Sequence, residues 1–134
     1  MLVGIILMTM TSMNSKSLVT ANVTSYGPLS KYVGGLGPQH VIAVQEHHVP
    51  IDRLGEQQDV LQDLGWRGLW APAPVTPQGG AMGGVAILAP STVQVTAPPA
   101  LEHHVLWEGR MIAGHVHWGT NGGIVVVNVY MDVE

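Results

Sequence analysis

Short apolar runs rich in β-branched residues alternate along the chain with glycine and proline. Such runs are typical of β-strands, and continuous apolar stretches such as VIAV, VAIL and IVVV favour strands covered on both faces. The sequence TNGG near the C-terminus predicts a hairpin turn between the last two of these strands. The pattern predicts six strands, at Ser17–Val23, Val41–Gln45, Gly84–Leu88, Thr92–Thr96, Arg110–Trp118 and Gly123–Tyr130.

One helix is clearly predicted, at Asp52–Leu64, because it ends before Gly65 and carries apolar residues at helical spacing. A weaker pattern predicts a second helix around Pro28–Leu36, and the stretch Ala71–Gly83 is rich in Pro and Gly and is predicted to be a loop. Strand, helix, strand and then hairpin strands predict an α/β (α+β) fold with mixed sheets and one clear flanking helix. The apolar face of that helix should pack on a sheet through Ile51, Leu54, Leu61 and Leu64.

The beginning of the chain differs from the rest. Its first ten residues, MLVGIILMTM, are apolar, but they lack the basic region of a signal peptide and are too short to span a bilayer. We expect residues 1–16 to be an N-terminal extension, either disordered or an extra strand, and residues 17–134 to form a single domain. No membrane partner is predicted.

The composition of the chain excludes several classes of protein and of binding site. Of the 134 residues, 46% are hydrophobic and 10% are charged, which excludes a disordered chain. The formal net charge is -4 and the five Lys and Arg residues are scattered, so the chain has no basic stripe of the kind that grips nucleic acid. The absence of cysteine excludes disulfides and thiolate metal sites, and it favours an intracellular setting.

Candidate chemistry lies late in three of the predicted strands. Asn22, Glu46 and Tyr130 each follow an apolar run. Ligands of layered α/β proteins gather beyond the strand ends. An amide, a carboxylate and a phenol at such ends predict a site for a metal and an anionic substrate.

Six segments in a fixed order carry a resemblance to a known family: TANVTSYG, VIAVQEHH, LGWRGLWAPA, GGVAIL, GRMIAGHV and IVVVNVYM. Over residues 17–131 the chain resembles the endonuclease/exonuclease/phosphatase superfamily, and most closely its apurinic-type and retroelement endonucleases. The resemblance implies a partial four-layer α/β/β/α sandwich and the metal-dependent hydrolysis of phosphate esters, with nucleic acid among the candidate substrates.

The resemblance also implies roles for individual residues. Glu46 matches the glutamate that binds Mg2+ or Mn2+, and one carboxylate can anchor such an ion, which keeps several waters. Asn22 matches the asparagine that positions the metal-site carboxylates and the phosphate. Tyr130 matches a tyrosine that contacts the scissile phosphate, and His48 lies where relatives place a residue that approaches it.

Two segments of the family, a G-D-x-N segment and an S-D-H-like segment, do not occur in the chain. We therefore expect the N-terminal half of such a domain, truncated and inactive as an isolated chain. The alternative is a non-catalytic remnant that acts as a binding module, with a partner chain covering an exposed sheet face.

Simpler readings of the same residues stay open. Glu46 could be an exposed strand end, Asn22 a turn residue and Tyr130 a packing residue. The tryptophans Trp66, Trp70, Trp107 and Trp118 could stack on bases or anchor the core. A zinc site is a further alternative, built from His47, His48, His103, His104, His115 and His117.

Overall fold

The structure is a computed structural model that describes residues 2–10, 17–23, 26–37, 40–118 and 122–132. The helical elements are α1 (Tyr26–Gly34), the short 3-10 helix η1 (Ile51–Arg53) and α2 (Leu54–Asp63). The strands are β1 (Leu2–Met10), β2 (Ser17–Asn22), β3 (His40–Gln45), β4 (Trp66–Ala71), β5 (Val85–Pro90), β6 (Val95–Thr96), β7 (Val105–Trp107), β8 (Met111–Val116) and β9 (Ile124–Asp132).

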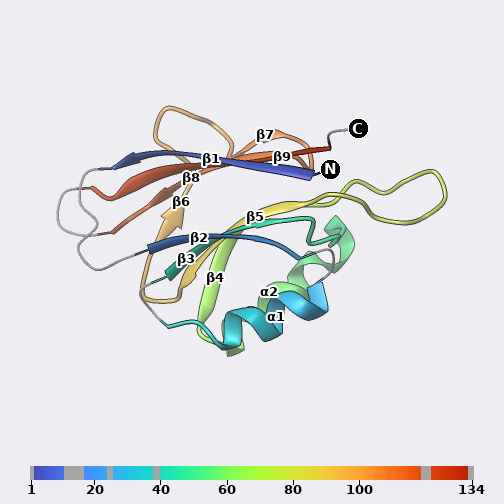
Figure 1. Ribbon diagram of the computed structural model, residues 1–134, viewed down its shortest axis with the longest axis horizontal. Coiled ribbons are helices and arrows are strands. Elements are labelled where there is room, and N and C mark those ends of the chain that lie inside the picture. Colours follow the sequence, from blue (N-terminus) through green and yellow to red (C-terminus); the bar gives the residue numbers. More distant parts are fainter. Residues whose placement is uncertain (1, 11–16, 24–25, 38–39, 119–121, 133–134) are drawn as a thin grey trace.

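The strands form two sheets (Figure 1). The five-stranded sheet has the order β1-β9-β8-β6, β7 also pairs with β8, and every pairing is antiparallel. The four-stranded sheet has the order β2-β3-β5-β4, in which β2 and β3 run parallel and the other pairs are antiparallel. The parallel pair places the carboxyl ends of β2 and β3 at the same edge of the sheet.

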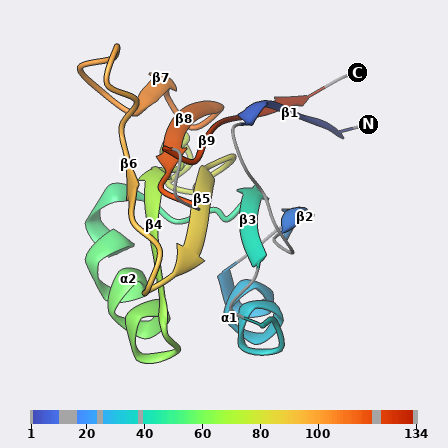
Figure 2. The same cartoon turned by 90° about the vertical axis from the view of Figure 1, so that its left-hand side faces the viewer.

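Two apolar cores separate three layers, which Figure 2 shows as the five-stranded sheet, the four-stranded sheet and the helices. One core lies between the sheets and includes Ile87, Ile112 and Val126. The other lies between the four-stranded sheet and the two α-helices and includes Leu29 and Leu61. The predicted α/β class with mixed sheets is confirmed, and of the four layers that the resemblance implies, the described residues form three.

The predicted long helix is present, but its buried face differs from the prediction. The segment begins as η1 and continues as α2. Ile51 and Leu64 are 73% and 45% exposed, so these two residues do not pack on the sheet as expected. Instead Gln57 joins Leu61 on the buried side of α2. The second helix is α1, which begins two residues before the predicted position.

All six predicted strands are present, and the prediction missed β4 and β7. Trp66 and Trp70 lie on the same side of β4 and are buried against the helices, so they anchor the core and are not free to stack on bases. Trp118 is also buried, in the core between the sheets. Trp107, at the end of β7, is 54% exposed and is the exception among the four tryptophans.

Residues 2–10 form a strand, which is one of the two structures expected for the N-terminal extension. β1 pairs antiparallel with β9 over nine residue pairs, from Leu2↔Asp132 to Met10↔Ile124. Residues 11–16, which complete the predicted extension, lie outside the described part, as do residues 119–121 of the predicted hairpin turn. Among the described helices, none is long and apolar enough to cross a membrane.

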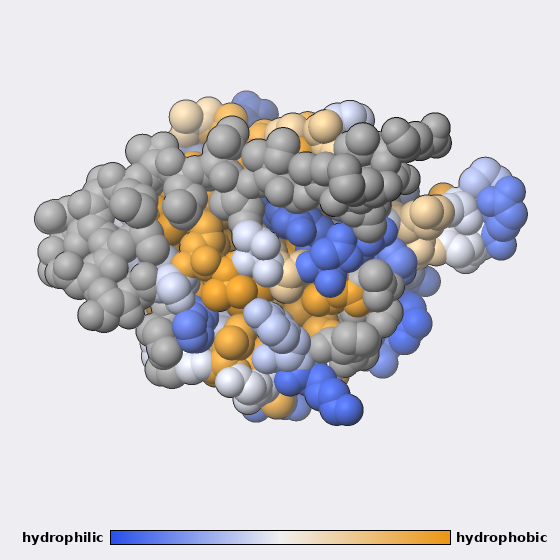
Figure 3. Space-filling view, viewed as in Figure 1, coloured by the Kyte–Doolittle hydropathy of each residue, from blue (hydrophilic) through white to orange (hydrophobic). Residues whose placement is uncertain are grey.

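The outer edge of the four-stranded sheet is incompletely covered. β3 is almost entirely buried, whereas every residue of its neighbour β2 is half-buried or exposed. Leu18 packs partly against the core between the sheets, and Ala21 partly against the helix-side core. Figure 3 shows apolar surface on this face of the molecule, around β2 and β3. The expected partner chain over an exposed sheet face stays a prediction.

Candidate functional site

The backbone turns sharply where β3 ends. Glu46 and His48 have φ angles of +60° and +58°, which are the positive values found among described residues other than glycine. Residues that carry a Cβ atom are disfavoured in this left-handed region of backbone conformations. His47 and His48 donate their backbone N–H groups to the carbonyls of Gly84 and Gly83, which hold the turn against the beginning of β5. Backbone strain of this kind often marks functional sites.

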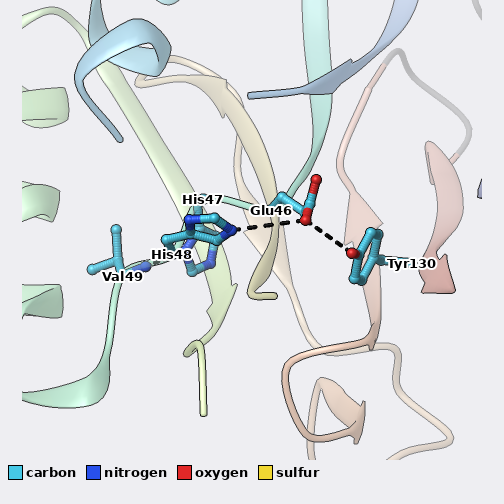
Figure 4. A network of polar contacts seen from close by, with 5 residues as sticks. All are labelled: Glu46, His47, His48, Val49 and Tyr130. Carbon is cyan, nitrogen blue, oxygen red and sulfur yellow. Dashed lines mark hydrogen bonds and ion pairs between the residues drawn. The ribbon is translucent and has the colours of Figure 1, made fainter. Parts of the chain in front are cut away.

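Glu46 meets Tyr130 across the two sheets. The Tyr130 hydroxyl donates to Glu46 Oε1 at 2.9 Å, and the two residues are 84 positions apart in the sequence. Both are buried, with 7% and 5% of their surfaces exposed. Figure 4 shows the Glu46 carboxylate between Tyr130 on one side and His48 on the other. Two of the predicted site residues on separate sheets are therefore in direct contact.

The second carboxylate oxygen, Glu46 Oε2, is buried and has no hydrogen-bond partner in the described structure. His48 Nε2 lies 3.8 Å from Glu46 Oε1, which is too long for a hydrogen bond but suits an ion pair when the imidazole is protonated. An unsatisfied buried carboxylate oxygen is costly, so a water molecule or a cation is expected to contact it. A hard divalent ion fits this oxygen, because Mg2+ prefers oxygen ligands and is held by as few as one or two carboxylates.

The His47 side chain holds the turn in place through two hydrogen bonds to the backbone. It is fully buried, Nε2 donates to the Ala71 carbonyl at 3.1 Å, and Nδ1 accepts from the Val49 N–H at 2.9 Å. Both ring nitrogens are thus satisfied in the neutral form, and burial lowers the pKa of His47 to about 4. Its ring also contacts Trp70 edge-on, with 5.0 Å between centroids. The imidazole is a structural support for the site.

A glycine makes room for this imidazole. Gly84 has a φ of +88°, and a Cβ at this position would overlap the His47 ring. The Gly-Gly pair that begins the GGVAIL segment thus has a local reason: it lets the chain pass close to His47 and enter β5.

A buried amide network joins the sheets beside Glu46. Asn128 on β9 is fully buried, and its side-chain N–H groups donate to the carbonyls of Val44 and Ala86, each at 2.9 Å. Its Oδ1 accepts from Gln45 Nε2 at 2.8 Å. Sequence reasoning named neither Gln45 nor Asn128 as a site residue, although Gln45 directly precedes Glu46 and Asn128 stands two residues before Tyr130.

Asn22 does not join the contact between Glu46 and Tyr130. It lies opposite Gln45 in the parallel pairing of β2 and β3, and therefore at the same edge of the sheet as Glu46. Its side chain is exposed. Its predicted role at the metal site stays a prediction.

The histidines of the zinc alternative are spread over separate places. His104 Nε2 donates to the Trp70 carbonyl, and the rings of His115 and His117 stack with 4.2 Å between centroids. Within the part of the chain that the structure describes, no three His, Asp or Glu side chains form a group that would hold a metal ion. The structure thus does not support the zinc alternative, and at Glu46 too it brings together fewer than three such side chains among the described residues.

Comparison of the chain with protein-family models, with curated proteins and with solved structures gives no match.

Proposed function

We propose that this chain carries the glutamate half of a metal-dependent phosphoesterase site of nuclease type. The observation that carries the proposal is the state of the Glu46 carboxylate, which is buried, held through Oε1 by Tyr130 and left without a partner at Oε2. Mg2+ or Mn2+ is the cation that fits Oε2, and when bound it would stabilise negative charge on a phosphate ester. The support for this function is local geometry together with the resemblance of the motifs.

The residues around the carboxylate have distinct parts in this proposal. Tyr130 orients Glu46 and keeps one of its oxygens occupied, so that the other faces the cation. His48, 3.8 Å from Glu46, is placed to carry a proton and to approach the anionic substrate from the rim of the site. Asn22 lies at the same sheet edge and is the candidate for contacts to the phosphate.

Metal binding tests the proposal directly. Titration of the purified 134-residue chain with Mn2+, followed by calorimetry and by the electron paramagnetic resonance signal of free Mn2+, should show one site. Glu46→Gln should abolish that site, because the amide has no negative charge. Glu102→Gln is the matched control, since Glu102 is an exposed carboxylate elsewhere on the chain. Equal Mn2+ binding by wild type and Glu46→Gln would overturn the proposal.

We expect binding without turnover from the 134-residue chain. Around Glu46 the described residues provide no second carboxylate, and no histidine there is oriented by an aspartate to activate water. Hydrolysis of a phosphodiester by the purified chain, lost in Glu46→Gln, would contradict this expectation of inactivity and would strengthen the assignment of Glu46.

A binding module is the second candidate, because β2 is a partly uncovered sheet edge with apolar surface around it. A partner chain at this edge would protect the half-buried side chains of β2. Size-exclusion chromatography and binding of a hydrophobic dye test this function. Association or strong dye binding supports it, whereas a monomer that binds no dye contradicts it.

A further inference from the structure

A small pocket adjoins Tyr130. The loop between β4 and β5, which projects from the body of the molecule in Figure 1, forms one wall through Pro74, Thr76 and Met82. Arg110 and Tyr130 also line the pocket, which has a volume of about 160 Å³. Pockets for whole small molecules measure roughly 300–1,000 Å³, so this one suits a compact group such as a phosphate.

Arg110 is the cation among the residues that line this pocket, and within the described part of the chain it forms no ion pair. Its guanidinium carbon lies 5.9 Å from the centroid of the Tyr130 ring and 5.8 Å from that of the Trp107 ring. Neither Glu108 nor any other acidic side chain of the described residues forms an ion pair with it. A half-buried guanidinium held between two rings keeps its N–H groups available for an anion, and its planar fork matches phosphate oxygens.

Trp107 extends this arrangement to the surface. It is 54% exposed at the end of β7, whereas the other three tryptophans are buried. Proteins bind unpaired nucleobases by stacking them on exposed aromatic rings next to an arginine, since every base offers a face for stacking. Val75 and Met82, which are 63% and 59% exposed, add apolar surface on the loop that borders the pocket.

We propose that Arg110 and Trp107 form a nucleotide subsite beside the Glu46–Tyr130 pair. Arg110 binds one backbone phosphate in the pocket, and the Trp107 indole stacks on an unpaired base outside it. The inference rests on the proposed phosphoesterase function for its relation to catalysis and names single-stranded nucleic acid as the substrate class. Because the pocket contains a single arginine and the chain has a net charge of -4, binding should be weak and the affinity should fall as salt is added.

Tryptophan fluorescence tests this subsite, because Trp107 is the exposed indole of the chain. The 134-residue protein is titrated with oligothymidylate in EDTA at low salt, so that no metal takes part. Stacking should quench the Trp107 emission, and an abasic oligonucleotide of equal length should bind more weakly and without quenching. Inorganic phosphate should compete with both. Equal affinity for the two oligonucleotides, or binding without quenching by oligothymidylate, would overturn the stacking role.

Matched variants separate the two contacts. Arg110→Gln should weaken binding by roughly tenfold, whereas Arg110→Lys should retain part of the affinity because it keeps the charge but not the planar fork. Lys31→Gln is the control, since it removes one exposed positive charge from α1. Trp107→Leu should weaken binding by roughly fivefold or more, the effect of losing one stacked base. An Arg110→Gln variant that binds as the Lys31→Gln control does would overturn the phosphate role.

The two proposals fail in different ways. Glu46→Gln should lose Mn2+ binding and keep oligonucleotide binding in EDTA, because Arg110 and Trp107 do not need the metal. Loss of Mn2+ in this variant without any oligonucleotide binding by the wild type would overturn the subsite alone. Oligonucleotide binding by the wild type together with unchanged Mn2+ binding by Glu46→Gln would support the subsite and overturn the metal site.

Discussion

The Tyr130 hydroxyl donates a hydrogen bond of 2.9 Å to Glu46 Oε1, and this contact joins the end of β3 in one sheet to β9 in the other. Tyr130→Phe removes the donor and leaves a second buried oxygen of Glu46 unsatisfied. We expect the free energy of unfolding to fall by about 1–3 kcal/mol. Urea denaturation measures it, with Tyr32→Phe as a control, since Tyr32 is 41% exposed on α1. Equal losses in the two variants would show that the contact contributes nothing.

The buried His47 should make stability depend on pH. Burial lowers its pKa to about 4, against 6.5 in the unfolded chain, so between these values the unfolded state binds more protons. The stability from His47 is therefore complete above pH 6.5 and is lost as the pH falls toward 4. The full effect is on the order of 3 kcal/mol. Urea denaturation at pH 7 and pH 4.5 should show a smaller decrease in His47→Gln than in wild type, and parallel decreases would contradict the assignment.

His48 tests the strained turn. Both His48→Gly and His48→Ala remove the imidazole, but only glycine adopts a φ of +58° without strain. We expect His48→Gly to be more stable than His48→Ala by about 1 kcal/mol. Thermal denaturation of the two variants measures the difference. Identical melting temperatures would indicate that the turn is not held in the left-handed region in solution.

Gly84 and Gly55 form a matched pair for a glycine-to-alanine exchange. At Gly84 the added methyl group would overlap the His47 ring, and the φ of +88° adds strain, so Gly84→Ala should be destabilising by roughly 2 kcal/mol or more. At Gly55 in α2 the methyl group meets no atom within 4 Å, and alanine should be stabilising by about 0.5–1 kcal/mol. Chemical denaturation should give opposite signs, and two equal shifts would contradict the close approach at His47.

Asn128 provides the fifth test of stability. Its amide makes three buried hydrogen bonds, to Gln45 and to the carbonyls of Val44 and Ala86. Asn128→Ala should be destabilising by about 3 kcal/mol or more, because each buried partner left unsatisfied costs about 1–3 kcal/mol. Asn22→Ala is the control on an exposed strand position and should change stability little. Equal losses of stability in Asn128→Ala and Asn22→Ala would show that Asn128 does not hold the two sheets together.

The sequence predicted the strands that are continuous and apolar, because burial on both faces leaves a composition that is easily read. It missed β4, whose signal is an alternation of Trp66, Gly68 and Trp70 rather than an aliphatic run. Glu46 was singled out from its place after an apolar run, and in the structure it accepts a hydrogen bond from Tyr130. That Tyr130 would reach Glu46 rather than solvent could not be read from sequence, since it depends on how two sheets stack.

The buried amide of Asn128 likewise could not be predicted from the sequence. A lone Asn within VVVNVY looks like an interruption of an apolar strand, and only the facing sheet supplies the carbonyls that satisfy Asn128. His47 follows an apolar run in a polar segment, but the turn at Glu46 folds its side chain into the protein, where it is fully buried. In both cases the deciding contacts come from segments distant in sequence.

Asn128 and Tyr130 stand two residues apart on β9, and this spacing puts both side chains on the face that meets the other sheet. A slip of one residue in the pairing of β9 would turn both side chains to the opposite face. Asn128 therefore fixes the register of β9, because its three hydrogen bonds form only in the alignment that also presents the Tyr130 hydroxyl to Glu46. One residue inserted between Asn128 and Tyr130 would turn the two side chains to opposite faces of β9, so that the Tyr130 hydroxyl would no longer reach Glu46 while Asn128 kept its hydrogen bonds.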